Sequence, residues 1–315
     1  MQPLRAEGIR GNWATLLSCW NADESLDLGR LAAQIDALIG FRPDGIYSHG
    51  TAGEFHTQTE AEFDAVATLL AERCNAAAIP FQIGVSHPIA QVALERLRRI
   101  AALAPGAVQL VLPDWFPVTD DEAGAFLERM AEHASGIGLV LYNPPHAKRV
   151  LGPAEMALLA ARCEALIGWK TAGGDDAWFE SVRAHDLHRR LSVFVPGHLL
   201  ASGVRRGAHG AYSNVACLHP GAAQAWSDGM ATDLDGALEV EGRLRQFMAQ
   251  AIAPFITRDR YCNAACDRLL AAVGGWGAAF GGVGESMRWP YRSIPGSEIA
   301  RVRAAARALV PEFIA

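Results

Sequence analysis

Lysine is almost absent from this chain, because Lys148 and Lys170 are the only lysines among its 28 basic residues and the rest are arginine. A guanidinium stays protonated in proteins, whereas a desolvated lysine amine loses its proton and can then form an imine with a carbonyl. Drift toward arginine accounts for most of this skew. It still reduces the search for a nucleophilic amine to two residues.

The two lysines have different surroundings. Lys170 follows the apolar run LIGW at residues 166–169 and precedes the turn TAGGDD. Reacting groups of barrel enzymes sit at the C-terminal ends of strands, and a dry barrel interior there favours the neutral amine. Lys148 follows the polar stretch YNPPHA, where an ammonium stays hydrated. We therefore expect Lys170 to be the nucleophile and Lys148 to be a surface or substrate-facing charge.

Tyr142 is the second candidate for chemistry, at the end of a predicted strand and just before Asn143, Pro144 and Pro145. Consecutive prolines hold the chain extended and so fix the direction of the tyrosine. A phenol near a barrel centre can exchange protons with a carbinolamine or polarise a substrate oxygen. From this motif alone, a tyrosine that merely fills the core is the alternative.

The third candidate is the turn HGTAGE at residues 49–54. Gly50 and Gly53 let backbone N–H groups converge on a carboxylate, and Thr51 adds a hydroxyl. All three candidates fall at predicted strand ends, so a single barrel would bring them together.

These positions depend on an alternation of short apolar runs and amphipathic segments through the first 220 residues. Eight strands alternating with helices favour a closed (β/α)8 TIM barrel in the α/β class. A doubly wound open sheet is the alternative, and the absence of G-x-G-x-x-G after the first strand disfavours its dinucleotide-binding form. The predicted strands are residues 13–17, 45–48, 81–85, 107–112, 138–142, 166–169, 192–195 and 210–213, and the predicted helices are 28–39, 60–73, 89–102, 122–133, 154–162 and 177–185.

Capping signals support several helix starts. Thr57 and Thr59 each precede a glutamate by three residues, as in a capping box. Pro88 and Pro153 fall where a first helical turn tolerates proline.

The strand signals stop after about residue 220. We expect a (β/α)8 barrel catalytic domain over residues 1–225 and a C-terminal helical domain over residues 226–315. The predicted features of the tail are helices at 222–253, 263–273 and 298–309, a glycine-rich stretch at 274–284 and an extended stretch at 288–295.

Composition bounds the class of protein. The chain has 315 residues, of which half are hydrophobic and a fifth charged, and this suits a globular protein with a sizeable core. A net charge of −6 with scattered arginines argues against a nucleic-acid surface. No apolar run approaches the roughly 18 residues of a membrane span, and the N-terminus lacks the layout of a secretory signal. We expect a cytoplasmic protein with reduced cysteines; Cys262 and Cys266 lie one helical turn apart without further zinc ligands nearby.

The order of the three motifs GTAGE, YNPP and GWKTAGGD resembles the dihydrodipicolinate synthase and N-acetylneuraminate lyase family of class I aldolases. The resemblance extends over nearly the whole chain, including the tail that contains RWPYRSIPGSEIARVRAA. It implies a barrel with a C-terminal helical domain, a homo-oligomer that is usually a homotetramer, and catalysis without a metal or an organic cofactor.

The resemblance also implies roles for the two best candidates. Lys170 corresponds to the lysine that condenses with the 2-oxo group of pyruvate or a related 2-keto acid. Tyr142 corresponds to the tyrosine that shuttles protons during imine formation and during the making or breaking of the C–C bond.

Four further site residues follow from the same resemblance. Thr51 and Ala52 fall on an adjacent hydroxyl pair that holds the keto-acid carboxylate and relays protons, and Gly50 precedes them. Ala52 lacks the hydroxyl but keeps a backbone N–H for the carboxylate. Tyr212, in GAYSN, falls on a position that contacts the pyruvyl group through its backbone.

Two departures argue against a lysine-pathway synthase. Trp115 stands where those synthases carry a tyrosine donated across a subunit interface, and Ala147 stands where they carry an arginine that binds the incoming semialdehyde carboxylate. Trp115, His146 and Trp178 suggest a bulkier or more apolar second substrate.

We therefore expect a Schiff-base lyase, an aldolase or a dehydratase, that acts on a small 2-keto acid and has no nucleic-acid or membrane partner. A metal-dependent barrel lyase is one alternative, with Glu54, Asp114 and Asp175 as the available ligands. A keto-acid sensor or inactive barrel is another, motivated by Ala52 and Trp115.

Overall fold

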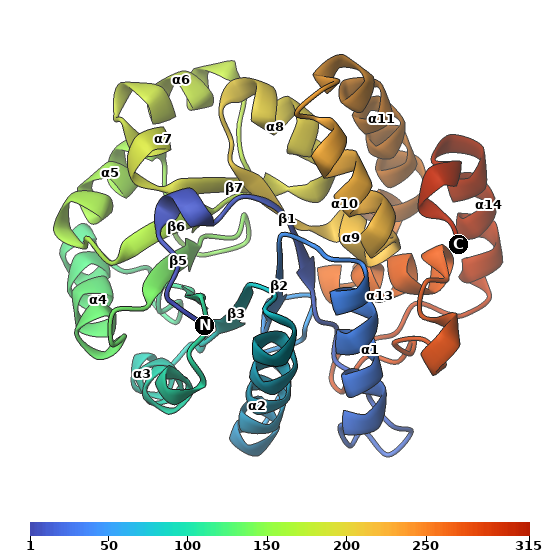
Figure 1. Ribbon diagram of the computed structural model, residues 1–315, viewed down its shortest axis with the longest axis horizontal. Coiled ribbons are helices and arrows are strands. Elements are labelled where there is room, and N and C mark those ends of the chain that lie inside the picture. Colours follow the sequence, from blue (N-terminus) through green and yellow to red (C-terminus); the bar gives the residue numbers. More distant parts are fainter.

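The computed structural model describes residues 1–315, and its centre is a closed barrel of eight parallel strands in chain order (Figure 1). The predicted (β/α)8 barrel is therefore confirmed, and the open-sheet alternative is wrong because β1 also pairs with β8. The strands are β1 (Gly11–Thr15), β2 (Gly45–Ser48), β3 (Phe81–Gly84), β4 (Ala107–Leu110), β5 (Gly138–Tyr142), β6 (Leu166–Lys170), β7 (Ser192–Pro196) and β8 (Gly210–Ser213).

Helices surround the barrel and continue past β8 (Figure 1). None of them is long and apolar enough to cross a membrane. The helices are α1 (Leu28–Gly40), α2 (Glu60–Ala77), α3 (Ala90–Ile100), α4 (Asp120–His133), α5 (Pro153–Arg162), α6 (Asp176–Ala184), α7 (Leu187–Arg190), α8 (Leu200–Arg206), α9 (Asn214–Leu218), α10 (Pro220–Gly229), α11 (Leu234–Phe247), α12 (Ala253–Thr257), α13 (Asn263–Gly274) and α14 (Glu298–Leu309).

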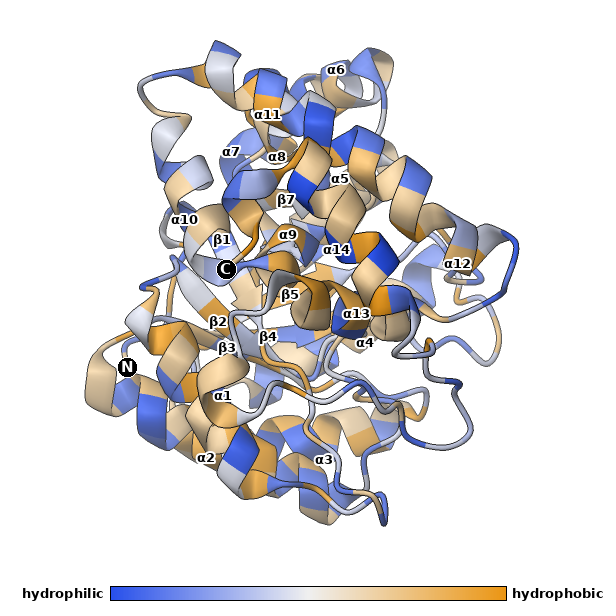
Figure 2. Ribbon diagram, turned by 90° about the vertical axis from the view of Figure 1, so that its right-hand side faces the viewer, coloured by the Kyte–Doolittle hydropathy of each residue, from blue (hydrophilic) through white to orange (hydrophobic).

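Two large apolar cores hold the barrel together, one inside it and one between strands and helices, and a third small cluster is formed by Phe179, Val195 and Ala208. The inner core includes Trp13, Val140, Phe194 and Tyr212, whose side chains fill the barrel as packed layers. The outer core takes the opposite face of each strand and the apolar stripes of the helices. Figure 2 shows hydrophobic and hydrophilic residues on the same outer helices, as this packing requires.

The first strand begins and ends two residues earlier than predicted. Gly11 and Asn12 are weak strand formers, yet they pair with Gly210 and Ala211 of β8. The strand ends before Leu17, because the backbone of that residue bonds to the Gln34 side chain instead of a neighbouring strand. The Leu17 N–H donates to Gln34 Oε1 and the Leu17 carbonyl oxygen accepts from Gln34 Nε2, at 2.8 Å each.

Two of the four helix-start predictions are confirmed. Thr59 caps α2 in a capping box with Glu62, and Pro153 is the first residue of α5. Thr57 is not a cap, because its hydroxyl instead donates to the Glu54 carbonyl oxygen at 3.0 Å. Pro88 lies outside the first turn of α3, which starts at Ala90.

The C-terminal helices differ from the prediction in one place. The helix predicted over residues 222–253 is interrupted between α10 and α11, where the Asp233 side chain accepts from the Gly236 N–H and starts a new helix. A π-helical segment, η4 (Met248–Ile252), then joins α11 to α12. The predicted helices 263–273 and 298–309 are confirmed as α13 and α14, and residues 288–295 form no strand. The division into domains at residue 225 stays a prediction.

Candidate active site

A cavity of about 240 Å³ lies at the C-terminal ends of the barrel strands. Its walls come from two sources: the ends of strands such as β5, β6 and β8, and the helical segments η4, α12 and α13 from beyond the barrel. Lys170, Tyr142, Thr51, Ala52 and Tyr212 all line it. The structure therefore brings five of the six predicted site residues to one cavity.

Lys170 is the last residue of β6, and its register places it opposite Tyr142 on β5. Side chains at paired positions of neighbouring strands point to the same face, here the barrel interior. The Lys170 Nζ lies 4.1 Å from the centroid of the Tyr142 ring, 4.8 Å from that of Tyr47 and 4.9 Å from that of Tyr212. Its one hydrogen-bond acceptor is Gln109 Oε1, at 3.4 Å. The amine therefore sits in a cage of three tyrosine rings.

Burial lowers the pKa of Lys170 to about 7, and the negative charge of Asp267 offsets only part of this effect. Desolvation disfavours the ammonium because the charged form loses its hydration. A substantial share of the amine is thus neutral near pH 7, as nucleophilic attack requires.

The cause of this dry setting differs from the one predicted. Leu166 and Trp169 belong to the outer core, with Trp169 packed on Trp178 at a centroid distance of 5.1 Å. Ile167 packs against the inner core, because a register shift between β5 and β6 turns this residue inward. Leu166 and Trp169 therefore do not surround the amine, which is buried among the tyrosines of the barrel interior.

Tyr142 joins the lysine to the turn after β2. Burial raises the pKa of its phenol, and the Thr51 side chain acts against that rise. Phenol and hydroxyl line the same cavity as Lys170, where both can exchange protons with a bound substrate.

The turn at residues 49–54 presents unused donors to the cavity. The backbone N–H groups of Thr51 and Ala52 donate to no protein acceptor. They are free for a carboxylate, and Ala52 needs no hydroxyl for this contact. The glycines of the turn serve close packing, since a Cβ on Gly50 would lie 2.7 Å from the Tyr47 ring and one on Gly53 would lie 2.9 Å from the Leu16 carbonyl oxygen. Gly50 itself does not line the cavity.

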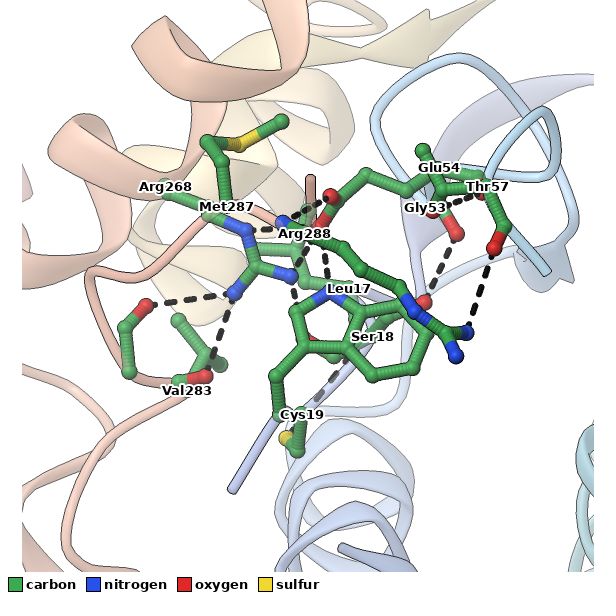
Figure 3. Close-up of polar contacts among 12 residues, drawn as sticks. Leu17, Ser18, Cys19, Gly53, Glu54, Thr57, Arg268, Val283, Met287 and Arg288 are labelled. Carbon is green, nitrogen blue, oxygen red and sulfur yellow. Dashed lines mark hydrogen bonds and ion pairs between the residues drawn. The ribbon is translucent and has the colours of Figure 1, made fainter. Parts of the chain in front are cut away.

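A buried ion pair fixes this turn to the C-terminal helices (Figure 3). Arg268 of α13 and Glu54 of the turn have side chains that are 1% and 0% exposed, and Arg268 Nε donates to Glu54 Oε1 at 2.8 Å. The same guanidinium donates to the Ser18 carbonyl oxygen at 2.6 Å, and the same carboxylate accepts from Trp20 Nε1 at 3.0 Å. Fully paired buried charges specify one arrangement of the segments that carry them.

Tyr212 forms the floor of the cavity. Its hydroxyl donates to Gln82 Oε1 at 2.7 Å, and its ring packs on Tyr47 and Phe194 at centroid distances of 4.9 and 4.6 Å. The side chain is thus held below the lysine.

The residues suggested for a second substrate do not gather in this cavity. Trp178 packs on Trp169 and Phe179 outside the barrel, and Trp115 is 76% exposed. Lys148 donates to the Trp115 carbonyl oxygen at 2.6 Å. His146 lines a second cavity of about 240 Å³, which meets the first at Thr51 and Tyr142 and is also lined by Ala147.

The carboxylates considered as metal ligands are engaged separately. Glu54 pairs with Arg268, Asp175 caps α6 by accepting from the Trp178 N–H at 2.9 Å, and Asp114 accepts from the Lys148 N–H at 2.9 Å. No three metal-binding side chains gather anywhere in the chain. All six cysteines are free thiols.

The sequence reasoning missed the groups that enter from beyond β8. Asp267 and Cys266 of α13 line the cavity, as do Asn214 and Cys217 of α9 and His198 of the segment after β7. Asn214 is the last residue of the GAYSN stretch, so that motif could have indicated it as a site residue. No local signal marks Asp267, because helical spacing does not reveal which face of α13 meets the barrel.

A closed barrel with a desolvated lysine and a tyrosine at adjacent strand ends has the architecture of an aldolase-type lyase. The model of the Dihydrodipicolinate synthetase family matches residues 9–264, so the chain belongs to that family and is an aldolase-type lyase. The resemblance read from the motifs is confirmed.

Relatives and a solved structure agree with this placement. An uncharacterised DapA-like lyase of Halobacterium salinarum is 27% identical over 215 residues, covering 68% of this chain and 69% of that protein. The N-acetylneuraminate lyase of Citrobacter koseri is 25% identical over 211 residues, covering 65% and 68%. The crystal structure of YagE from E. coli K12, of the dihydrodipicolinic acid synthase family and in complex with pyruvate, aligns with a TM-score of 0.81 at 21% identity, covering 96% of this chain and 98% of that one. At 21% identity, this structural similarity shows a shared fold alone.

Proposed function

We propose that this protein is a Schiff-base-forming lyase whose substrate is pyruvate or a related 2-keto acid. The observation that carries the proposal is the Lys170 amine, held among three tyrosine rings at a strand end with its pKa lowered to about 7. Such an amine attacks the C2 carbonyl as a neutral nucleophile.

The groups around Lys170 suit each step of this chemistry. The free N–H groups of Thr51 and Ala52 hold the keto-acid carboxylate, and Tyr142 with Thr51 relays protons as the carbinolamine forms. Loss of water leaves an iminium on Lys170, which draws electrons from C3 when a C–C bond there is made or broken. The same enamine also supports a dehydration.

The finer identity follows from residues outside this centre. Ala147 stands in the second cavity where the lysine-pathway synthases carry an arginine, and the neighbouring Arg149 is already paired with Asp120 and Glu155. Both observations support a lyase other than a lysine-pathway synthase. We further propose a homo-oligomer, in keeping with the family resemblance, with the barrel in residues 1–225 and the helical domain in residues 226–315.

Trapping with pyruvate and cyanoborohydride is expected to add one reduced keto-acid adduct to Lys170. Below its pKa the amine is protonated and unreactive, so raising the pH toward about 7 increases the initial rate, by about tenfold per unit well below that pKa. An ordinary lysine would continue this rise up to its usual value of 10.5, whereas the rise for Lys170 ends at about 7. Peptide mass spectrometry across pH 5 to about 8 measures both the site and the rate.

A protein that gains no mass on Lys170 at any pH does not form a Schiff base, and the proposal then fails. An adduct that forms on Lys170 without turnover of any compound in a broad panel of aldehydes and 2-keto acids would instead favour a keto-acid sensor, the reading that Ala52 motivates. Product formation from the panel identifies the second substrate.

Substitution Tyr142→Phe is expected to lower turnover by about 10²- to 10⁴-fold, because it removes the phenol that moves protons beside Lys170. The ring remains, so the cage and the lowered pKa of Lys170 are kept. The trapping rate at each pH distinguishes the two effects: a slower rate with an unchanged acid-side midpoint supports the relay. A midpoint that moves toward the value of a free lysine would show that the phenol acts only on the charge of the amine.

A further inference from the structure

Asp267 stands out among the carboxylates of this chain because it lines the cavity and has no protein partner. It lines the cavity from α13, as Cys217 does from α9 and Thr51 from the turn after β2. Its carboxylate takes part in no hydrogen bond and in no ion pair, not even with Lys170. The side chain of the adjacent Arg268 is paired with Glu54 (Figure 3). A carboxyl group kept unpaired at the edge of a dry cavity is free to react with what enters the cavity.

Among the groups on which the charge of Asp267 acts, one is basic; His198 also lines the cavity, but burial lowers its pKa and Asp267 does not act on it. The charge of Asp267 acts on Lys170 of β6, Tyr142 of β5, Tyr47 of β2 and Cys217 of α9, and on Cys266 of its own helix. Burial raises the pKa of both thiols and both phenols, so these four groups are neutral near pH 7. The one group here that exchanges charge with Asp267 is the amine.

Burial acts on the carboxyl of Asp267 and on the amine of Lys170 in the same sense, since it disfavours the charged form of each. Burial raises the pKa of Asp267 to about 7, and burial lowers that of Lys170 to about 7, while each charge partly offsets the effect on the other. Burial therefore favours the neutral amine and the neutral carboxylic acid over the two charged forms, because it penalises both charges. These neutral forms are a nucleophile and an acid in one cavity.

We propose that Asp267 is a catalytic acid of this cavity, which protonates the departing hydroxyl of the carbinolamine formed on Lys170. The inference rests on the proposed Schiff-base function and adds a residue to it. The neutral amine bonds to C2 of the keto acid, and one proton moves from nitrogen to oxygen to give the carbinolamine. The C2–O bond then breaks as the Asp267 proton joins the hydroxyl, releasing water. The iminium and the Asp267 carboxylate remain as a pair of opposite charges.

Acid strength favours Asp267 over the phenol for this step. Burial raises the pKa of Tyr142 above its usual value near 10, so its phenol is a weak donor to a leaving hydroxyl. General acid catalysis is most effective when the pKa of the donor lies near the operating pH. The carboxyl of Asp267 meets this condition. Tyr142 remains suited to a relay in which its phenol accepts one proton while it donates another.

The variant Asp267→Asn separates this role from a purely electrostatic one, because the two predict opposite changes. Removing the negative charge lowers the pKa of Lys170 further, so an electrostatic role makes trapping by pyruvate and cyanoborohydride faster at pH about 6. A proton donor, once removed, makes trapping slower by at least about 100-fold at the same pH. In the wild type the rate falls again as Asp267 loses its proton above pH about 7, and the variant lacks this fall.

Two control variants complete the experiment. Asp267→Glu keeps an acid at this place and is expected to recover most of the rate, whereas Asp121→Asn removes an equal charge at a side chain that is 99% exposed and leaves the rate unchanged. Circular dichroism and thermal unfolding establish that each variant is folded. A folded Asp267→Asn protein that traps pyruvate as fast as the wild type, or faster, overturns the inference while the Schiff base on Lys170 stands. Absence of an adduct in the wild type instead refutes the proposed function itself.

Discussion

Replacing Lys170 with arginine is expected to abolish adduct formation and to lower turnover by about 10⁴-fold or more, the scale seen when a nucleophile is removed. A guanidinium keeps its charge even in a dry site, so it presents no lone pair to the keto-acid carbonyl. Intact-protein mass after trapping and turnover of the substrate found in the panel measure the two effects.

Arginine is larger than lysine and would press on the tyrosine cage, so a second variant is needed. Lys170→Met has a similar length and no charge, and the one hydrogen bond it removes is the 3.4 Å contact to Gln109. We expect it to be inactive but to unfold at a temperature no lower than the wild type, because the buried amine costs stability in its charged form. Lys148→Arg is the matched control, since it removes the only other lysine and should leave the adduct on Lys170 intact. An adduct that survives in Lys170→Met would place the nucleophile elsewhere.

The sequence placed Lys170 and Tyr142 correctly because strand ends are local features. Each lies where an apolar run meets proline or glycine, and parallel strands that close a barrel bring such ends together. The cause of the low pKa of Lys170 was not local. It depends on Tyr47 and Tyr212, whose strands reach the lysine only in the closed barrel.

The helical tail was the harder part to predict. Its helices were recognised at α13 and α14, but a helical pattern does not specify rotation about the axis or the partner surface. Asp267 and Arg268 are adjacent in sequence, yet one faces the cavity and the other a buried glutamate. Trp178 shows the opposite error: the sequence suggested a substrate contact for it because it lies near a strand end, but it packs on Trp169 outside the barrel. Both outcomes are set by tertiary packing.

The buried pair of Glu54 and Arg268 makes the second large prediction. Arg268→Met is expected to lower the free energy of unfolding by about 3–5 kcal/mol, because it leaves the Glu54 carboxylate buried without its cation. The Trp20 indole N–H and the Arg288 backbone N–H, at 3.0 and 3.3 Å, remain but carry no full charge. Urea-induced unfolding monitored by tryptophan fluorescence measures the change.

A double-mutant cycle tests whether this cost arises from the pair. Glu54→Gln alone leaves Arg268 charged and buried and is also destabilising, but in the Arg268→Met background it removes an unpaired charge. The double variant should therefore lose at least about 1 kcal/mol less than the sum of the single variants. Asp235→Asn serves as the control, because it breaks a surface ion pair with Arg205. The side chain of Arg205 is 51% exposed and that of Asp235 is 90% exposed, so the free energy of unfolding should change by no more than about 1 kcal/mol. Strict additivity at Glu54 and Arg268 would mean that the turn carrying Thr51 and Ala52 is held to α13 by packing alone. A coupling energy between Glu54 and Arg268 would instead show that their ion pair holds the turn against α13. The N–H groups of Thr51 and Ala52 would then be positioned by the same helix that places Asp267 in the cavity.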